Sequence, residues 1–127
     1  MPMIVALAVA LGASTGALLR WCLGMLLNSI FPTIPLGTLT ANLVGGFLMG
    51  IFMGVMINPL FFSDTSKLFI ATGFLGGLTT FSTFSAETVH LLQTGQYVFL
   101  ALIIFSHVAG SIAATLLGIY TIKIITS

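Results

Sequence analysis

The sequence predicts an all-α membrane protein with four transmembrane helices, the third of them broken, and three observations support this fold class. Of the 127 residues, 58% are hydrophobic and only 4% are charged, and the mean hydropathy is +1.25. A water-soluble domain of this length needs a polar surface, which this composition does not supply. Four apolar runs are long enough to cross a hydrocarbon core of about 30 Å, for which a helix needs roughly 20 residues. One of these runs is interrupted by glycines and threonines.

The four spans are expected at about residues 3–27, 37–57, 68–93 and 97–125, and they form a single domain over residues 1–127. Turn residues separate them: NSIFPTIP follows the first span, INPLFFSDTSK the second and QTGQ the third. The small residues near the N-terminus resemble those of a cleavable signal peptide. The basic segment that begins such a peptide is missing, so we interpret the first run as a span.

Lys and Arg are too few and too evenly placed to fix one orientation in the membrane. With four spans, the N-terminus, Lys67 and Lys123 share one side, while Arg20 lies toward the other. The bias of Lys and Arg between the two sides normally sets orientation, and here it is weak. The sequence therefore predicts insertion in both orientations, which allows an antiparallel homodimer.

Small residues recur at helical spacing in three of the four spans. In a membrane, such stripes let helix backbones approach closely, which drives association where burial of apolar side chains gives little gain. They predict tight helix packing and favour assembly into a dimer that encloses a lumen. The stripes consist of Gly12 and Gly16; of Asn42, Gly46, Gly50 and Gly54; and of Gly110, Ala114 and Gly118.

Polar residues inside the spans are expected to face protein or water rather than lipid. Asn42 heads the stripe of the second span, where it could join two helices or contact an ion. Ser111 and Thr115 share a face of the fourth span, although such hydroxyls can bond the carbonyl four residues back. His107 lies on the same face, and as a lone histidine we interpret it as a packing residue rather than a ligand or proton carrier.

The segment GFLGGLTTFSTFSAE, residues 73–87, predicts the break in the third span. Gly76 and Gly77 precede Thr79 and Thr80, a run of poor helix propensity in the middle of an apolar segment. Unwound backbone at membrane depth is tolerated only where protein buries it or a cavity wets it. The freed carbonyls suit a small hard cation, and the freed amides together with hydroxyls suit an anion.

After the break, Phe81 and Phe84 are three residues apart and project from one helical face, with Ser82 and Thr83 between them. Aromatic ring edges are weakly positive because the ring quadrupole is negative on its face. Ring edges, an asparagine amide and hydroxyls can thus replace water around a small anion without a full charge that would trap it. The residues alone predict a small-ion site at a helix break and leave the identity of the ion open.

This segment, together with GALLRW at 16–21, GTLTANLVGG at 37–46 and GSIAAT at 110–115, closely resembles the bacterial fluoride ion channels called Fluc or CrcB. The resemblance covers the whole chain. It implies an antiparallel dual-topology homodimer with two pores in the bacterial inner membrane. It also implies passive, fluoride-selective export of cytoplasmic fluoride, which confers fluoride resistance. The expected partners are fluoride, the lipid bilayer and a second copy, with no nucleic acid and no enzymatic activity.

The resemblance also implies roles for individual residues. Asn42, Phe81 and Phe84 match the residues that contact fluoride, and Arg20 matches a basic residue at the vestibule. A central structural sodium ion is held at the dimer interface by backbone carbonyls, which here match those of Gly76 and Thr79. A polar track along the pore is matched by Ser82, Thr83, Glu87, Ser111 and Thr115.

Two positions of this chain complicate the match to the family. A Glu87 carboxylate beside an anion path makes sense chiefly if it is neutral or turned away. Where some relatives carry an aromatic hydroxyl on the fourth span, this chain has Ile103 and Ile104.

Two other classes of protein share some of these features. A proton-coupled exporter of the small multidrug-resistance type has a similar length, four spans and dual topology, but it needs a carboxylate in the first span, which has none here. A pore-forming lysis protein would need neither Asn42 nor the TTFSTF run. The fluoride channel is therefore the preferred interpretation, with the exporter as its alternative.

Overall fold

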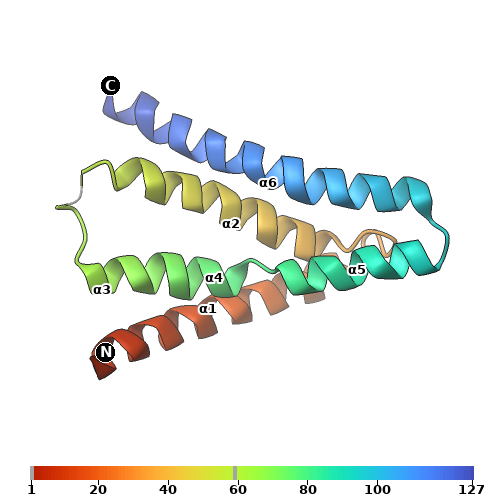
Figure 1. Ribbon diagram of the computed structural model, residues 1–127, viewed down its shortest axis with the longest axis horizontal. Coiled ribbons are helices and arrows are strands. Elements are labelled where there is room, and N and C mark those ends of the chain that lie inside the picture. The colour runs from red at the N-terminus through yellow and green to blue at the C-terminus, as the bar shows by residue number, and fades with distance from the viewer. Residues whose placement is uncertain (1, 59) are drawn as a thin grey trace.

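The computed structural model describes residues 2–58 and 60–127, and it is a bundle of long helices (Figure 1). The predicted spans are confirmed to within about one helical turn at each end. Pro59, which the sequence assigns to a turn, lies outside the described residues. The elements are α1 (Met3–Leu27), α2 (Leu36–Val55), α3 (Asp64–Lys67), the π-helix η1 (Leu68–Leu75), α4 (Gly76–Leu78), α5 (Phe81–Gln93) and α6 (Tyr97–Thr126).

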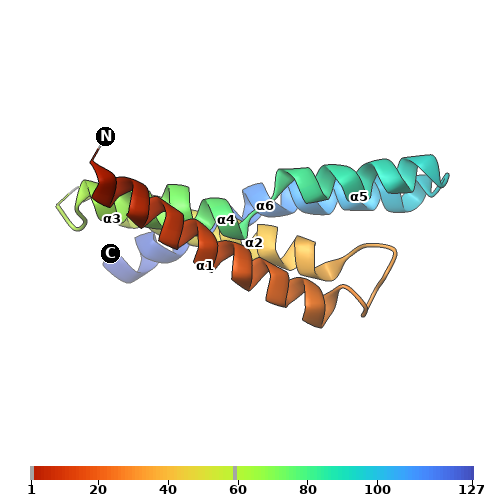
Figure 2. The same ribbon diagram turned by 90° about the horizontal axis from the view of Figure 1, so that it is seen from below.

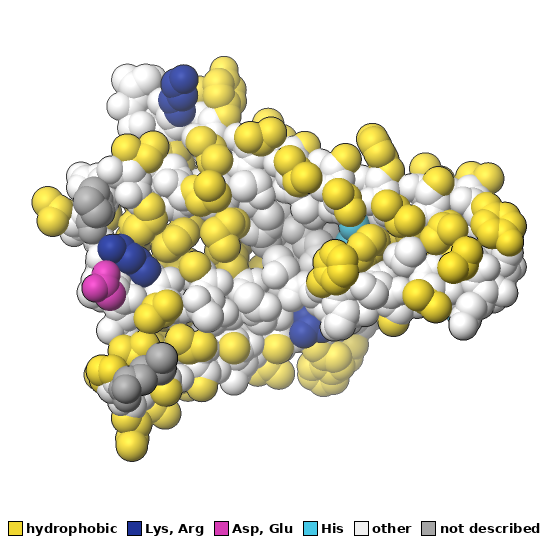
Figure 3. All heavy atoms as spheres, viewed as in Figure 1, with side chains coloured by type: hydrophobic (Ala, Val, Ile, Leu, Met, Phe, Trp, Pro, Cys, Tyr) yellow, Lys and Arg dark blue, Asp and Glu magenta, His cyan; other side chains and the backbone are white. Residues whose placement is uncertain are grey.

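Among the described residues, four helical segments are long and apolar enough to cross a membrane, and the third runs from Asp64 to Gln93 through α3, η1, α4 and α5. Both chain termini lie at the same end of the bundle as the connection between α2 and α3, as an even number of spans requires (Figures 1 and 2). Hydrophobic side chains are spread over the face shown in Figure 3, and most of its few charged side chains lie at that same end. The all-helical membrane fold is thereby confirmed.

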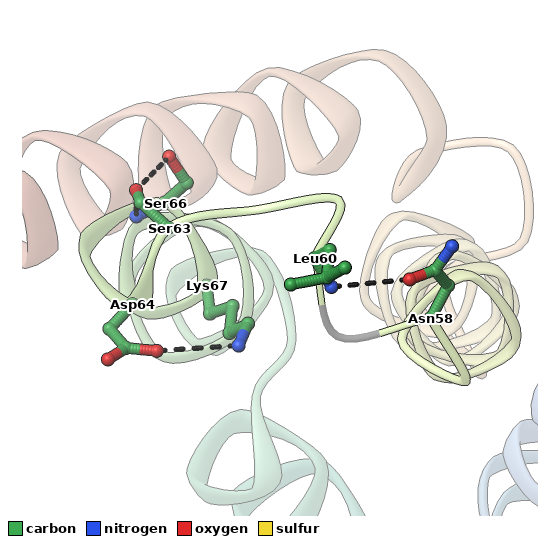
Figure 4. A network of polar contacts seen from close by, with 6 residues as sticks. All are labelled: Asn58, Leu60, Ser63, Asp64, Ser66 and Lys67. Carbon is green, nitrogen blue, oxygen red and sulfur yellow. Dashed lines mark hydrogen bonds and ion pairs between the residues drawn. The ribbon is translucent and has the colours of Figure 1, made fainter.

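The connection between α2 and α3 is ordered by short polar contacts (Figure 4). Asn58 Oδ1 accepts a hydrogen bond from the Leu60 amide at 3.3 Å. Ser63 caps α3 by accepting from the Ser66 amide at 3.1 Å, as expected for a serine that precedes a helix. Lys67 and Asp64 form an ion pair at 3.3 Å. Because Asp64 is almost fully exposed, this pair contributes little to stability.

The third span breaks at Thr79 and Thr80, where Figure 1 shows a coil between α4 and α5. Both threonines have extended backbone angles, φ −85° and ψ 154° for Thr79 and φ −148° and ψ 121° for Thr80. The sequence placed the break across GGLTT, but Gly76 and Gly77 remain helical. Gly77 instead allows close packing, because a Cβ there would collide with the Ala13 backbone of α1. The break is therefore shorter than predicted.

The glycine stripes produce the predicted tight packing, but they do so within one chain. A Cβ on Gly46 would lie 2.9 Å from the Ser111 carbonyl oxygen, and one on Gly54 would lie 2.8 Å from Ile122 Cβ, both on α6. In α1, Gly12 and Gly16 meet the backbone of η1 and α4 in the same way. Helices of the same chain cover these glycines, so the dimer that the stripes also favour stays a prediction.

Two small buried clusters lie on either side of the break. The first joins Ala41 of α2 to Leu75 and Leu78, before the break. The second lies after the break and consists of Ile34, Phe84, Leu91 and Ile103. Each half of the third span is therefore anchored by its own packing, which leaves the extended residues between two fixed points.

Candidate functional site

Asn42 of α2 binds the extended backbone at the centre of the break. The Thr80 amide donates to Asn42 Oδ1 at 2.7 Å, and Asn42 Nδ2 donates to the Thr80 carbonyl oxygen at 3.0 Å. An extended residue in an apolar bundle needs such partners, because its N–H and C=O no longer bond within a helix. The side chain of Asn42 thus takes the place of the missing helical hydrogen bonds.

The two threonines close the broken ends. Thr79 ends the first half by donating from both its amide, at 3.0 Å, and its hydroxyl, at 2.8 Å, to the Leu75 carbonyl oxygen. Thr80 begins the second half as an N-cap, since its Oγ1 accepts from the Thr83 amide at 3.2 Å. Threonine is a favoured N-cap residue, and this local chemistry explains why the break falls at the TT pair rather than at the glycines.

These contacts remove the helical donors from two backbone carbonyls. In a continuous helix the Thr80 amide would donate to the Gly76 carbonyl, but here it donates to Asn42. The Thr83 amide would donate to the Thr79 carbonyl, but here it donates to Thr80 Oγ1. The carbonyl oxygens of Gly76 and Thr79 are therefore released from the helical pattern at the break.

A groove of about 490 Å³ opens beside the break, between α2, both halves of the broken span and α6. Its walls are mainly apolar, with hydroxyls and an amide at intervals, which is the usual composition of a ligand-binding cavity. Seven of the predicted site residues line it: Asn42, Gly76, Thr79, Phe81, Phe84, Ser111 and Thr115.

Aromatic rings form a continuous column along this groove. Phe81 and Phe84 meet edge to face, with ring centroids 5.5 Å apart and an interplanar angle of 70°. Phe84 in turn stacks on the His107 imidazole at 4.6 Å and 30°. Phe84 is buried, whereas Phe81 is 76% exposed. A large apolar ring is thus presented at the mouth of the groove.

His107 is buried and packed, as the sequence indicated, but it also belongs to the groove. Asn42 Nδ2 lies 3.0 Å from His107 Nδ1, and the ring contributes to the groove wall. Nε2 is buried and has no hydrogen-bond partner among residues 2–58 and 60–127. The sequence signal for this arrangement is the spacing of four residues from Ser111, which places both residues on one face of α6.

A second recess, of about 360 Å³, lies on the other side of the break. The residues that line it come from α1 and its C-cap, from α2 and from the start of the second half of the broken span. Figure 2 shows the α5–α6 pair diverging from the α1–α2 pair. The polar residues that line the recess are Arg20, Asn28, Thr38, Thr80 and Thr83. Arg20 Nε donates to the Gly77 carbonyl oxygen at 3.1 Å, so this side chain also closes the end of α4. Thr80 lines both the recess and the groove.

Some predicted site residues lie outside the groove, or their polar groups bond to other parts of the chain. Ser82 is exposed and lines neither cavity. Glu87 lies outside the groove, where its Oε1 accepts from Thr38 Oγ1 at 2.5 Å. Thr115 lines the groove, but its hydroxyl donates to the carbonyl oxygens of Gly46, at 2.9 Å, and Ser111, at 3.0 Å. Thr38 was missed, although its spacing of four from Asn42 puts both on one face of α2.

Comparison with known proteins identifies the family. Residues 7–119 match the family described as CrcB-like protein, Camphor Resistance (CrcB). The chain belongs to the CrcB family. The resemblance drawn from the four sequence segments is therefore confirmed.

Similar CrcB proteins are named as fluoride-specific ion channels FluC. One from Nitrosospira multiformis is 57% identical over 116 residues, 91% of each chain. Others are 53% identical: one from Chromobacterium violaceum over 89% of this chain and 90% of its own, and one from Pseudomonas aeruginosa over 92% of each. With its four apolar helices, the chain is a multi-pass membrane protein of this bacterial family.

Proposed function

We propose that this CrcB protein is a fluoride-selective channel of the bacterial inner membrane, through which cytoplasmic fluoride leaves passively and which thereby confers fluoride resistance. The observation that carries the proposal is the aromatic column beside the break, in a chain similar to fluoride-specific ion channels. Ring edges and hydroxyls bind a small anion more weakly than a lysine would, which permits the ion to leave again. Passage of the ion through the channel requires no chemical reaction.

In this proposal fluoride passes between the recess and the groove around Thr80. Arg20 raises the local concentration of anions in the recess, since its guanidinium keeps further N–H donors after Nε has bonded Gly77. Phe81 and Phe84 then replace part of the water around the ion with ring edges. Ser82, Thr83, Ser111, Thr115 and Glu87 are retained as polar-track candidates, with Glu87 turned toward Thr38.

We further propose an antiparallel homodimer with two pores, in which a second copy covers the groove. In a single chain the groove would expose hydroxyls, an amide and the ring of Phe81 at membrane depth. Polar groups facing lipid are costly, so a protein surface is the favoured cover. A reporter fused to the C-terminus should be found on both sides of the membrane in cells. A reporter found on one side alone would contradict dual topology.

A structural sodium ion at the dimer interface is part of the same proposal. The carbonyl oxygens of Gly76 and Thr79 fit such an ion, because the break has diverted their helical donors and hard cations prefer oxygen ligands. When bound, the ion would supply positive charge that holds these carbonyl dipoles together. The chain itself keeps both carbonyl oxygens free of helical hydrogen bonds.

We expect Gly76→Val to weaken dimer formation without unfolding the chain. Gly76 has ordinary helical angles, and a Cβ there would meet only the Ala71 carbonyl oxygen at 3.7 Å, so the chain itself has room for the β-carbon. Any loss must then arise at the face presented to the ion and the partner. Size-exclusion chromatography with light scattering, in sodium and in sodium-free buffer, measures it. Ala86→Val, at an exposed position of α5, is the control. A Gly76→Val dimer as stable as that of Ala86→Val would argue against the sodium site.

Efflux from liposomes tests the central proposal. Purified protein is reconstituted with internal fluoride or chloride, and release is followed with ion-selective electrodes while a potassium ionophore balances charge. We expect rapid fluoride release, very slow chloride release and no requirement for a pH gradient. Equal release of both anions would refute selectivity. Dependence on a pH gradient would instead indicate a proton-coupled exporter.

A further inference from the structure

The orientation of the Asn42 side-chain amide is fixed by its contacts with Thr80. Its oxygen faces an N–H and its nitrogen faces a carbonyl oxygen, at 2.7 and 3.0 Å. Rotation of the amide by 180° would place donor against donor and acceptor against acceptor. Hydrogen-bond chemistry therefore assigns the nitrogen of Asn42 to the position beside the Thr80 carbonyl.

The same nitrogen determines where His107 carries its proton. An amide NH₂ group has two donors and no acceptor, and one of these donors is used by Thr80. The other faces His107 Nδ1 at 3.0 Å. Nδ1 must therefore accept, so the proton of a neutral imidazole lies on Nε2.

The Nε2–H group is left without a partner, and His107 is one of the residues that line the groove. Nε2 is buried, and no hydrogen-bond partner lies within reach among the described residues. Buried donors are nearly always satisfied, and one left unpaired is destabilising. The ring is held in place by stacking on Phe84 at 4.6 Å. An anion that reached this nitrogen from the groove would satisfy the donor.

We propose that Asn42 is a positioning residue, which holds Thr80 extended and fixes His107 in its Nε2–H form, so that His107 offers fluoride a neutral N–H donor. The inference rests on the proposed channel function and adds a chemical role for His107. A neutral donor binds an anion without the full charge that would retain it, which suits conduction. His107 thereby continues the path of ring edges begun by Phe81 and Phe84.

Nitrogen NMR of the imidazole tests the role of Asn42. His90→Gln leaves His107 as the single histidine of the chain. This substitution should not disturb the site, because His90 is exposed on α5 and lines neither the groove nor the recess. In this parent, labelled with ¹⁵N in the histidine ring, we expect the Nε2–H form. Adding Asn42→Asp replaces the donor by an acceptor, so the proton should move to Nδ1. A parent with the proton on Nδ1, or an unchanged spectrum after Asn42→Asp, would overturn the inference.

Fluoride titration of the same parent tests the role of His107. Sodium fluoride should shift the Nε2 resonance, whereas sodium chloride at equal ionic strength should not. Equal shifts with both salts, or none with fluoride, would contradict a donor that faces the fluoride path. Because this readout is spectroscopic, it does not depend on the rate of efflux.

Substitutions of His107 give an independent result if Asn42→Asp does not fold. The amide nitrogen of glutamine reaches the place of Nε2, that of asparagine reaches only the place of Nδ1, and leucine offers no donor. We expect His107→Asn and His107→Leu to conduct about tenfold more slowly than His107→Gln. Equal rates in all three variants would overturn the proposal. A parent that releases no fluoride would instead refute the channel function itself.

Discussion

Phe81→Ile should slow fluoride efflux by about tenfold or more while the fold is retained, since each 1.4 kcal/mol of lost stabilisation is worth about tenfold in rate. The ring of Phe81 is 76% exposed, so its removal costs the single chain little buried area. Isoleucine keeps an apolar side chain at the mouth of the groove. It has no ring edge, however, and it ends the edge-to-face contact with Phe84. The expected loss is therefore one of ion stabilisation rather than of folding.

Phe105→Ile is the matched control for this prediction. Phe105 is 71% exposed, so the two substitutions remove a similar amount of exposed aromatic surface. Phe105 lies on α6 but does not line the groove. Efflux from liposomes, measured with a fluoride electrode at matched protein density, should fall for Phe81→Ile alone. An equal fall in both variants would show that the effect is not specific to the groove.

Hydropathy and local capping preferences predicted the spans and the existence of a break. The length of each apolar run fixes each span, because a helix must match the thickness of the membrane. The TT pair could be placed near the break, since threonine favours an extended or capping position over a helical one. That Gly76 and Gly77 stay helical could not be read from the sequence. The role of Gly77 depends on α1, whose backbone lies against it.

Periodicity shows which residues share one face of a helix, but it does not show which helix covers that face. The stripe containing Gly46 and Gly54 was therefore recognised, while its pairing with α6 of the same chain was not. The same limit applies to the polar network of the site. Asn42 bonds Thr80, 38 residues away, and His107, 65 residues away, and neither contact has a local signal. Only the assembled bundle divides the candidate residues between the groove and the recess.

Gly50→Ala should destabilise the chain by about 3 kcal/mol, because it forces apart two closely packed helices. A Cβ at Gly50 would collide with the Thr115 carbonyl oxygen, and it would lie 2.9 Å from Thr115 C and 3.0 Å from Gly118 Cα. All of these are backbone atoms, so no side chain can rotate away. The helices α2 and α6 must separate instead. Equilibrium unfolding in detergent, followed by circular dichroism, measures the loss.

Gly110→Ala is the control for Gly50→Ala. It shows what a methyl group added to a membrane helix does when the neighbouring helix need not move. A Cβ at Gly110 would approach only Leu43 Cδ2, at 2.9 Å, which is the flexible end of a side chain and can move. Alanine also favours the helix over glycine by about 1 kcal/mol, so this variant should be close to neutral in stability. Gly50→Ala, in contrast, also threatens the bond from Thr115 Oγ1 to the Gly46 carbonyl oxygen. Because Gly46, Ser111 and Thr115 line the groove, separation of α2 from α6 should widen the proposed ion path as well. Unfolding equal to that of Gly110→Ala would mean that the two helices are not held by backbone contact at Gly50.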